Sequence, residues 1–309
     1  MFSTDPLVTI AIPTYNRADG YLYDALTSAV AQTYRNLEII VSDNCSMDNT
    51  QQVVRSVTDE RVRYIRHPEN IGAFNNWNSC VEQAKGVYFL LLHDDDLIDP
   101  DYVESCIRAC KGDFSRGILR TGTRVIDEHG NIRSETANMV GGYSTTKFFL
   151  GWFAAETALY LCSTLYNTDL LRGIGGFRSP TGLFVDAVAT ARLAPYGRVD
   201  VPEVKASFRR HGKNMGSRGR LQDWTEDSLY LLNVISELTP PTDRSTIRLR
   251  GGEFLSKKCY SYVPSLAFYK RPFAYYDVYK RFGFSFSPIN FIVSTFVKRA
   301  RARARDLFK

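Results

Sequence analysis

Three consecutive aspartates are the residues of this sequence best suited to hold a divalent cation. Asp94, Asp95 and Asp96 follow His93 directly after the apolar run Val87–Leu92. Adjacent carboxylates repel one another unless a cation or hydrogen-bond donors neutralise them. Mg²⁺ and Mn²⁺ accept oxygen ligands and bridge protein carboxylates to phosphates. The motif therefore predicts a metal-phosphate site, and the alternative is an acidic loop that caps a helix starting near residue 100.

Polar residues also follow two other segments that have the apolar, β-branched composition of buried strands, residues 7–12 and 37–41. The first leads into Pro13-Thr14-Tyr15-Asn16-Arg17 and the second into Ser42-Asp43-Asn44. The Asp43 carboxylate can accept the imide N–H of uracil or thymine, and Tyr15 offers a ring for base stacking. Alone, each segment is typical of a turn with helix-capping residues. Taken together with the acidic motif, the two polar segments indicate a nucleotide-binding site.

The segments that position these residues alternate between strand and helix patterns over the first hundred residues. Strands are expected at 7–12, 37–41, 62–65 and 87–92, and helices at about 22–30, 48–57 and 73–85. Such alternation predicts a parallel, Rossmann-like sheet with flanking helices, an α/β fold that binds ligands beyond the carboxyl ends of its strands. A helix at 101–110 and a strand at 118–126 follow. We expect residues 140–215 to be irregular and the chain after about residue 220 to be helical.

The charge distribution argues against a nucleic-acid binder. Of the net charge of +6, the segment from Lys298 to Lys309 carries +5, so no basic face is expected on the folded part. Over residues 293–308, apolar residues fall on one helical face and Lys or Arg on the other. This pattern is typical of a helix lying in a membrane surface; the alternative is a terminal helix packed on the protein. No signal peptide is visible, so we expect a cytoplasmic protein, peripheral to the membrane.

The motifs, in their order and spacing, resemble glycosyltransferase family 2. The resemblance extends from residue 7 to about residue 215, and its segments are Val8–Arg17, Ser42–Thr50, Asn70-Ile71-Gly72, Ala84-Lys85-Gly86 leading into His93–Asp96, and Gly175-Gly176-Phe177. It implies the GT-A fold, with a donor-binding half at residues 1–99, an acceptor-binding half at 100–219, and a helical C-terminal region at 220–309.

The resemblance also implies roles for individual residues. Pro13–Arg17 and Asp43 would bind the donor nucleotide, with Asp43 reading the base, and Asp94 would lie near the ribose and metal. Asp95 and Asp96 would hold Mn²⁺ or Mg²⁺. His93 stands where many members have an aspartate, which leaves the division of roles among the three aspartates open.

The second half should supply the general base. Family members often show an acidic pair about ten residues after the Gly-Gly-Phe segment, and here that position is Val185-Asp186. We expect Asp186 to be the base, and a helix N-cap is the alternative. Arg210, His211 and Lys213 resemble the family segment that closes over the donor diphosphate, and a solvated surface loop is the alternative. His211 would join the metal, and Arg210 and Lys213 would bind phosphate.

The predicted function is an inverting, metal-dependent transfer of a sugar from a nucleoside-diphosphate sugar, UDP-linked, to a saccharide or lipid-linked acceptor. A nicotinamide oxidoreductase is excluded because residues 13–20 lack the Gly-x-Gly-x-x-Gly turn. Two alternatives stay open. One is a nucleotidyltransferase, although the Gly-rich basic loop typical of that class is missing after the first strand. The other is a nucleotide-sugar-binding protein on a degenerate transferase fold, which Val185 favours.

Overall fold

The fold is that of a computed structural model, which describes residues 5–212 and 219–307, with side chains up to residue 297 in the last helix. The chain divides into two compact units, one formed by residues 1–178 and 185–214 and the other by residues 179–184 and 215–309. Lys213 lies outside the described residues. Within the described part, no helix has the length and hydropathy needed to cross a membrane.

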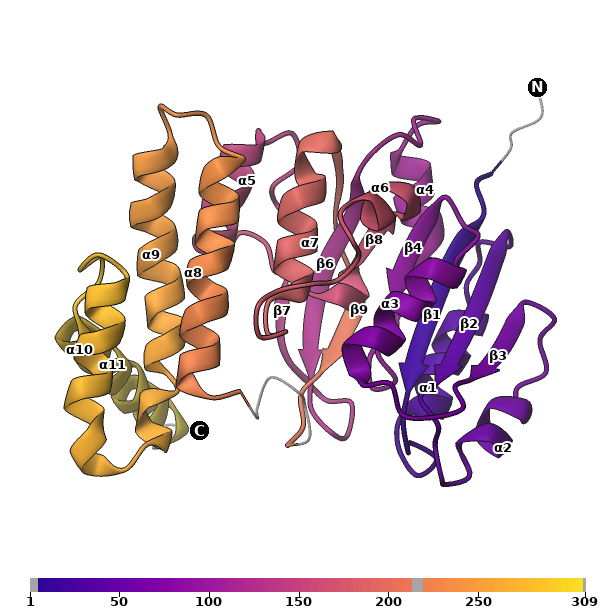
Figure 1. Ribbon diagram of the computed structural model, residues 1–309, viewed down its shortest axis with the longest axis horizontal. Helices are drawn as coiled ribbons and strands as arrows, with labels where there is room; N and C mark the ends of the chain where they lie inside the picture. Colours follow the sequence, from indigo (N-terminus) through magenta and orange to yellow (C-terminus); the bar gives the residue numbers. More distant parts are fainter. Residues whose placement is uncertain (1–4, 213–218, 308–309) are drawn as a thin grey trace. The chain divides into compact units, whose positions relative to one another are not determined.

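The first unit is built on a mixed nine-stranded sheet (Figure 1). Its strands run in the order β3-β2-β1-β4-β8-β6-β9-β5, and β7 pairs with the second part of β6, residues 123–126. The bounds of the strands are β1 Val8–Thr14, β2 Leu37–Asp43, β3 Val62–Arg66, β4 Tyr88–Leu91, β5 Leu97–Ile98, β6 Ile118–Ile126, β7 Ile132–Thr136, β8 Thr164–Asn167 and β9 Arg198–Arg209.

The longer strand pairs of the sheet are parallel. β1 pairs in parallel with β2 and β4, β2 with β3, and β6 with β9, whereas the antiparallel pairs β4–β8, β5–β9, β6–β7 and β6–β8 are short. The predicted fold class, a mostly parallel α/β sheet with flanking helices and a helical C-terminal region, is therefore confirmed. The division of residues 1–219 into donor and acceptor halves stays a prediction.

Helices cover both faces of the sheet in the first unit. On one face, β1 residues Ile10 and Ile12 pack with Leu26 of α1 and Tyr102 of α4 in a continuous apolar core. α3 packs against β1 and β2 and lies in front of the sheet in Figure 1. The helices of this unit are α1 Leu22–Val30, α2 Thr50–Arg55, α3 Ala73–Gln83, α4 Tyr102–Ala109, α5 Thr145–Phe153, α6 Thr168–Gly173 and α7 Val185–Leu193.

The prediction of an irregular segment at residues 140–215 is wrong. This segment contains α5, α6, α7, β8 and the twelve-residue strand β9. β9 reads Arg-Val-Asp-Val-Pro-Glu-Val-Lys-Ala-Ser-Phe-Arg, so its charges and Pro202 hide its strand character. Its pairing with β6 and β5 supplies the backbone order that its sequence does not signal.

The second unit is helical and includes a six-residue segment from the middle of the chain. Buried Asp227 accepts hydrogen bonds from the Ser179 hydroxyl (2.6 Å) and from the amides of Thr181 (2.8 Å), Leu183 (2.7 Å) and Phe184 (3.0 Å). The elements of this unit are α8 Leu221–Glu237, α9 Arg244–Tyr260, the 3₁₀ turns η4 Val263–Ser265 and η5 Phe268–Lys270, α10 Arg271–Arg281 and α11 Pro288–Leu307.

Candidate active site

The site begins where three parallel strands end at the same edge of the sheet. Thr14, the last residue of β1, lies in register with Asp43, the last residue of β2. The Leu92 amide donates to the Ala11 carbonyl at 2.9 Å, so the segment after β4 leaves the sheet at this edge as well. The structure therefore brings together the three polar segments that the sequence placed at strand ends.

Asp94 turns toward β1. Its Oδ2 accepts a hydrogen bond from the Thr14 hydroxyl at 2.8 Å, and its Oδ1 lies 3.6 Å from Nε of Arg17. Burial, together with the negative charge of Asp95, raises the pKa of Asp94 to about 7, against the lowering effect of Arg17. Of the three aspartates, Asp94 is thus the one tied to the predicted donor-binding segment.

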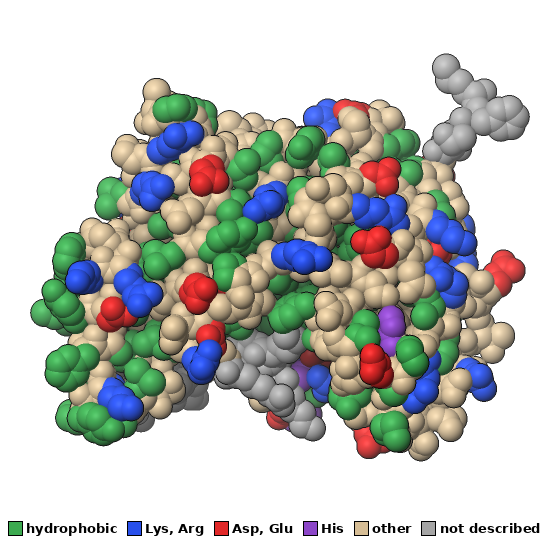
Figure 2. Space-filling model, in the orientation of Figure 1, with side chains coloured by type: hydrophobic (Ala, Val, Ile, Leu, Met, Phe, Trp, Pro, Cys, Tyr) green, Lys and Arg blue, Asp and Glu red, His purple; other side chains and the backbone are tan. Residues whose placement is uncertain are grey.

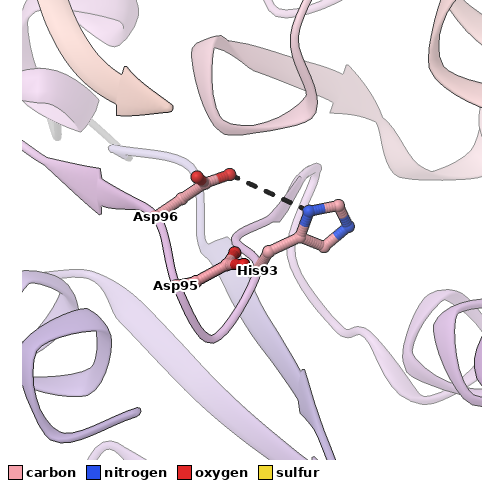
Figure 3. A group of neighbouring side chains, drawn as sticks. All are labelled: His93, Asp95 and Asp96. Atoms are coloured by element: carbon pink, nitrogen blue, oxygen red, sulfur yellow. Dashed lines mark ion pairs between the residues drawn. The ribbon is translucent and has the colours of Figure 1, made fainter. Parts of the chain in front are cut away.

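His93, Asp95 and Asp96 form a group of side chains able to hold a metal ion (Figure 3). One ligand atom from each lies within 4.8 Å of the others. Nδ1 of His93 is 3.8 Å from Oδ2 of Asp96, and the two side chains point toward one another in Figure 3. Burial and the charge of Asp95 hold the pKa of Asp96 well above its usual range. Such a carboxyl is stabilised in its charged form by a cation.

The donor set of this group fits a divalent transition metal. It combines carboxylate oxygens with an imidazole nitrogen, ligands that suit Mn²⁺. Burial lowers the pKa of His93, which favours the neutral imidazole that a metal requires. Nε2 of His93 is buried and makes no hydrogen bond within the described part of the chain, while its ring lies 4.8 Å from that of Trp77. The expected ligands Asp95 and Asp96 are therefore joined by His93, which the sequence did not assign to the metal.

His211 reaches the same motif from the segment after β9. Its Nε2 lies 2.7 Å from Oδ2 of Asp95, and both side chains are less than a tenth exposed. The ring of Tyr21, just before α1, lies 5.5 Å from the His211 ring. The proximity of His211 to Asp95 agrees with the predicted metal role, which stays a prediction.

Arg209 is a site residue that the sequence did not single out. Its amide donates to Oδ1 of Asp96 at 2.9 Å, and its buried guanidinium donates from Nε to the Asp95 carbonyl at 2.9 Å. The same guanidinium lies 4.2 Å from the Tyr21 ring centroid, a cation–π distance. Arg209 therefore holds the acidic motif in place. Its position at the end of β9 was the missing signal, because that strand was not predicted.

Asp43 is buried below a pocket at the ends of β2 and β3. Its Oδ1 accepts from the Ser46 amide at 2.8 Å, its Oδ2 accepts from the Tyr64 hydroxyl, and Nε of Arg66 lies 3.6 Å from Oδ2. The pocket has a volume of about 240 Å³ and is lined by Asp43, Ser46, Met47, Asp48, Gln51, Gln52 and Arg66. A carboxylate has about four acceptor positions, so these contacts leave Asp43 able to accept a further N–H.

The segment after β1 is pinned to the segment before α2. Asn16 has a positive φ of 52°, its amide donates to the Ser46 hydroxyl (2.8 Å), and its side-chain oxygen accepts from the Met47 amide (2.8 Å). The Arg17 amide donates to the Thr50 hydroxyl at 3.2 Å. Tyr15 is 44% exposed, whereas Pro13 and Thr14 are buried. Tyr15 is thus exposed at a fixed strand end, and its role in base stacking stays a prediction.

Asp186 lies in the first turn of α7, and its Oδ1 accepts a hydrogen bond from the next amide, that of Ala187, at 2.7 Å. Its charge acts on the phenol of Tyr160, whose pKa is raised mainly by burial and further by Asp186 and Asp96. The negative charges of Asp186 and of Asp96 in the acidic motif therefore both act on the Tyr160 phenol. The base role of Asp186 stays a prediction.

Arg210 also acts on Tyr160. The Arg210 amide donates to the Ile126 carbonyl at 2.8 Å, its side chain is exposed, and its positive charge lowers the Tyr160 pKa. The phosphate-binding role of Arg210 stays a prediction. Lys213, its expected partner in phosphate binding, falls in the part of the chain that is not described.

The Gly-Gly-Phe segment is anchored to α3 by Asn78. Oδ1 of Asn78 accepts from the Phe177 amide at 2.8 Å, and its Nδ2 donates to the Phe177 carbonyl at 3.2 Å. Gly175 and Gly176 have φ of 82° and 78°, and a Cβ on Gly176 would lie 2.2 Å from Oδ1 of Asn78. Glycine is therefore required at position 176, ten residues before Asp186.

Comparisons with known proteins agree with this arrangement. The family model described as Glycosyl transferase family 2 matches residues 9–167. Chondroitin synthase of Escherichia coli is 35% identical over 135 residues, which are 43% of this chain and 19% of that protein. The chain spans between 14% and 54% of the length of the curated relatives that it matches.

Solved structures share the fold. S. aureus TarS, residues 1–349, in complex with UDP-GlcNAc has a TM-score of 0.67 at 18% identity, covering 89% of this chain and 81% of that one. The mannosyltransferase PcManGT from Pyrobaculum calidifontis, in complex with GDP-Man and Mn²⁺, has a TM-score of 0.56 at 18% identity, covering 96% and 81%. With the family model matching half of its length, this chain belongs to glycosyltransferase family 2 and has the GT-A fold.

Proposed function

We propose that this chain transfers a sugar from a nucleoside-diphosphate sugar to a hydroxyl of a saccharide or lipid-linked glycan, with inversion at the anomeric carbon. The observation that carries the proposal is the group of His93, Asp95, Asp96 and His211 at the strand ends of a family 2 chain. The structural neighbours with UDP-GlcNAc and with GDP-Man support a nucleotide-sugar donor.

The donor nucleotide would bind at the ends of β1 and β2. Asp43 accepts a base N–H, and Tyr15 stacks on the base. A uracil imide meets both requirements, so we infer a UDP-linked donor. Thr14 and Arg17 hold Asp94 near the expected position of the ribose.

The cation site would be formed by Asp95 and Asp96 together with His93, and His211 would complete it. Mn²⁺ or Mg²⁺ bound there supplies positive charge that stabilises the departing diphosphate. Arg209 fixes the backbone and carboxylate of the motif, so that its oxygens keep their orientation. Arg210 and Lys213 add positive charge for the leaving group.

The proposed reaction is a single displacement. Asp186 takes the proton of the acceptor hydroxyl while the acceptor oxygen bonds to the anomeric carbon. The bond from that carbon to the diphosphate oxygen breaks at the same time, and the nucleoside diphosphate leaves with the electron pair. One base and no carboxylate nucleophile give inversion of configuration.

A membrane-associated acceptor is supported by α11. Its first half exposes Ile289, Ile292, Val293 and Phe296, at 48% to 73%. The sequence that follows, from Lys298 to Lys309, carries a charge of +5. We infer that this helix contacts an anionic membrane surface and that the protein acts in the cytoplasm, peripheral to the membrane.

The rival hypothesis is a binding protein without turnover, favoured by buried Val185 at a position where the family resemblance implies an acid. The test is donor turnover with Mn²⁺. Release of UDP from UDP-sugars, in water or with acceptor, is expected for the transferase. Tight donor binding with no UDP release over long incubation supports the binder and contradicts the transferase.

A further inference from the structure

Helix α10, together with the turn η5 before it, exposes a row of aromatic side chains. Phe268, Tyr269, Phe273 and Tyr276 are 82%, 70%, 77% and 60% exposed. Positions 269, 273, 276 and 280 follow helical spacing, so Tyr269, Phe273, Tyr276 and Lys280 form one stripe. We call Phe268, Tyr269, Phe273 and Tyr276 the aromatic face.

The opposite side of α10 is already packed within the second unit. Val278 and Phe282 are buried, and the Tyr275 ring lies 5.5 Å from that of Tyr260 on α9. α10 thus carries apolar side chains on two sides, and within the part of the chain whose side chains are described only the side with Val278 and Tyr275 is covered. Four large exposed rings in a row exceed the scattered apolar residues of an ordinary surface and indicate a binding face.

Basic residues border the aromatic face at both ends of α10. Lys270 and Arg271 lie at its start, with Nζ of Lys270 5.7 Å from the Tyr269 ring centroid and Cζ of Arg271 5.8 Å from that of Phe268. Lys280 and Arg281 lie at its end, and Asp277 pairs with Arg281 at 3.0 Å. Figure 2 shows hydrophobic side chains beside Lys and Arg over this helix, at the left of the view.

The charge of this part of the chain identifies the partner. Residues 266–297, which include the aromatic face, contain four Lys or Arg and one Asp, a net charge of +3, whereas the preceding 265 residues carry a net charge of −2. A symmetric contact between two copies would bring these basic borders together, which is unfavourable. Anionic lipid headgroups complement them, and Phe and Tyr rings suit the boundary between headgroups and acyl chains.

We propose that the aromatic face of η5 and α10 docks on an anionic membrane surface, with Phe273 and Tyr276 inserted below the headgroups. This surface is separate from the basic segment after Val297. It adds an apolar anchor to the electrostatic contact proposed for α11. An apolar anchor and an electrostatic contact together attach a protein to a membrane more stably than either one alone.

The test is sedimentation of the full chain with vesicles of phosphatidylcholine, alone or mixed with phosphatidylglycerol. Tyr276→Ser should weaken binding to the anionic vesicles about tenfold, because a ring leaves the apolar phase. Tyr196→Ser is the matched control, because Tyr196 is 56% exposed on the first unit. Phe273→Ser combined with Tyr276→Ser should reduce binding further. Equal binding by Tyr276→Ser and Tyr196→Ser overturns the proposal.

Two further measurements separate the contribution of the aromatic face from that of the basic segment after Val297. A variant with Arg299, Arg301, Arg303 and Arg305 changed to Gln should keep part of its vesicle binding, and that part should be lost with Phe273→Ser. Phe273→Trp should be quenched by brominated acyl chains. Complete loss of binding in the Arg variant, or no quenching of the new Trp, contradicts insertion of α10.

Light scattering tests the competing occupant, a second copy of the chain. A dimer that Phe273→Ser and Tyr276→Ser dissociate would assign the face to self-association and overturn membrane docking. Donor hydrolysis in solution should be equal in all these variants, since none of the changed residues belongs to the candidate active site. Failure of the docking proposal therefore leaves the transferase proposal standing, and the reverse also holds.

Discussion

Nε2 of His211 lies 2.7 Å from Oδ2 of Asp95, although 116 positions separate the two residues in the sequence. The contact joins the segment after β9 to the loop after β4. It places an imidazole beside a carboxylate that belongs to the candidate metal group. The candidate site therefore combines side chains from the loop after β4 with a side chain from the segment after β9. This arrangement leads to four predictions.

Asp95→Ala should abolish sugar transfer and remove the enhancement of UDP binding by Mn²⁺, because it deletes a proposed metal ligand. The fold should remain, since the Arg209 contact to residue 95 uses the backbone carbonyl. Calorimetry of UDP with and without Mn²⁺ measures the effect. Asp113→Ala, which removes an exposed acid paired with Arg116, is the control. Unchanged metal-dependent UDP affinity in Asp95→Ala would exclude Asp95 as a ligand.

His93→Asp should shift metal preference from Mn²⁺ toward Mg²⁺. The change replaces the only nitrogen donor of the His93, Asp95 and Asp96 group with oxygen, and Mg²⁺ prefers oxygen ligands. Competition of Mg²⁺ against Mn²⁺, followed by the electron paramagnetic resonance of free Mn²⁺, gives the ratio of the two affinities. An unchanged ratio would show that His93 lies outside the coordination sphere.

Arg209→Lys should weaken Mn²⁺ binding by about 10- to 100-fold, the usual effect of losing a residue that orients metal ligands. Lysine keeps the charge but lacks the fork that reaches the Asp95 carbonyl and lies over Tyr21. The lost charged hydrogen bond should lower the free energy of unfolding by about 1.5–3 kcal/mol. Arg210→Lys is the matched control, with little expected change in either quantity. Chemical denaturation and Mn²⁺ titration provide the two measurements.

Asp186→Asn should lower transfer by about 10²- to 10⁴-fold, the contribution typical of a general base. The Asn side chain keeps an oxygen acceptor for the Ala187 amide, so stability should change little. Donor affinity should persist, because Asp43 and the acidic motif lie at strand ends and not on α7. Near-normal transfer would direct attention to Glu156 or Asp169. Loss of both transfer and UDP binding would instead favour a purely structural role at the start of α7.

Much of the donor side could be predicted from the sequence because its strands are continuous apolar runs. β1 and β4 are buried along their length, and β2 at every residue except Glu38, so composition marks these strands, and the polar residues at their ends then fall at one edge. Because β1 and β2 are parallel neighbours, Thr14 and Asp43 lie side by side at their ends.

The other side of the site could not be predicted in the same way. Arg209 and Arg210 are adjacent in sequence, and only the position of β9 decides that the first is buried against the acidic motif and the second is exposed. His93 is another case, since its spacing gave no indication that Nδ1 approaches Asp96. The burial of Arg209 depends on contacts across the sheet. The approach of His93 to Asp96 depends on how the loop after β4 folds, which local composition does not reveal.

The segment 179–184 has a consequence for how this chain can be altered or recombined. Its four hydrogen bonds to Asp227 assign it to the helical unit, although residues of the sheet unit precede and follow it. A chimera made by exchanging only the sequence after residue 214 would remove Asp227 and leave the hydrogen-bond donors of segment 179–184 without their buried acceptor, a cost of about 1–3 kcal/mol for each donor left unpaired. Exchange of helical units among relatives therefore requires two grafts. The shorter of them ends two residues before Asp186.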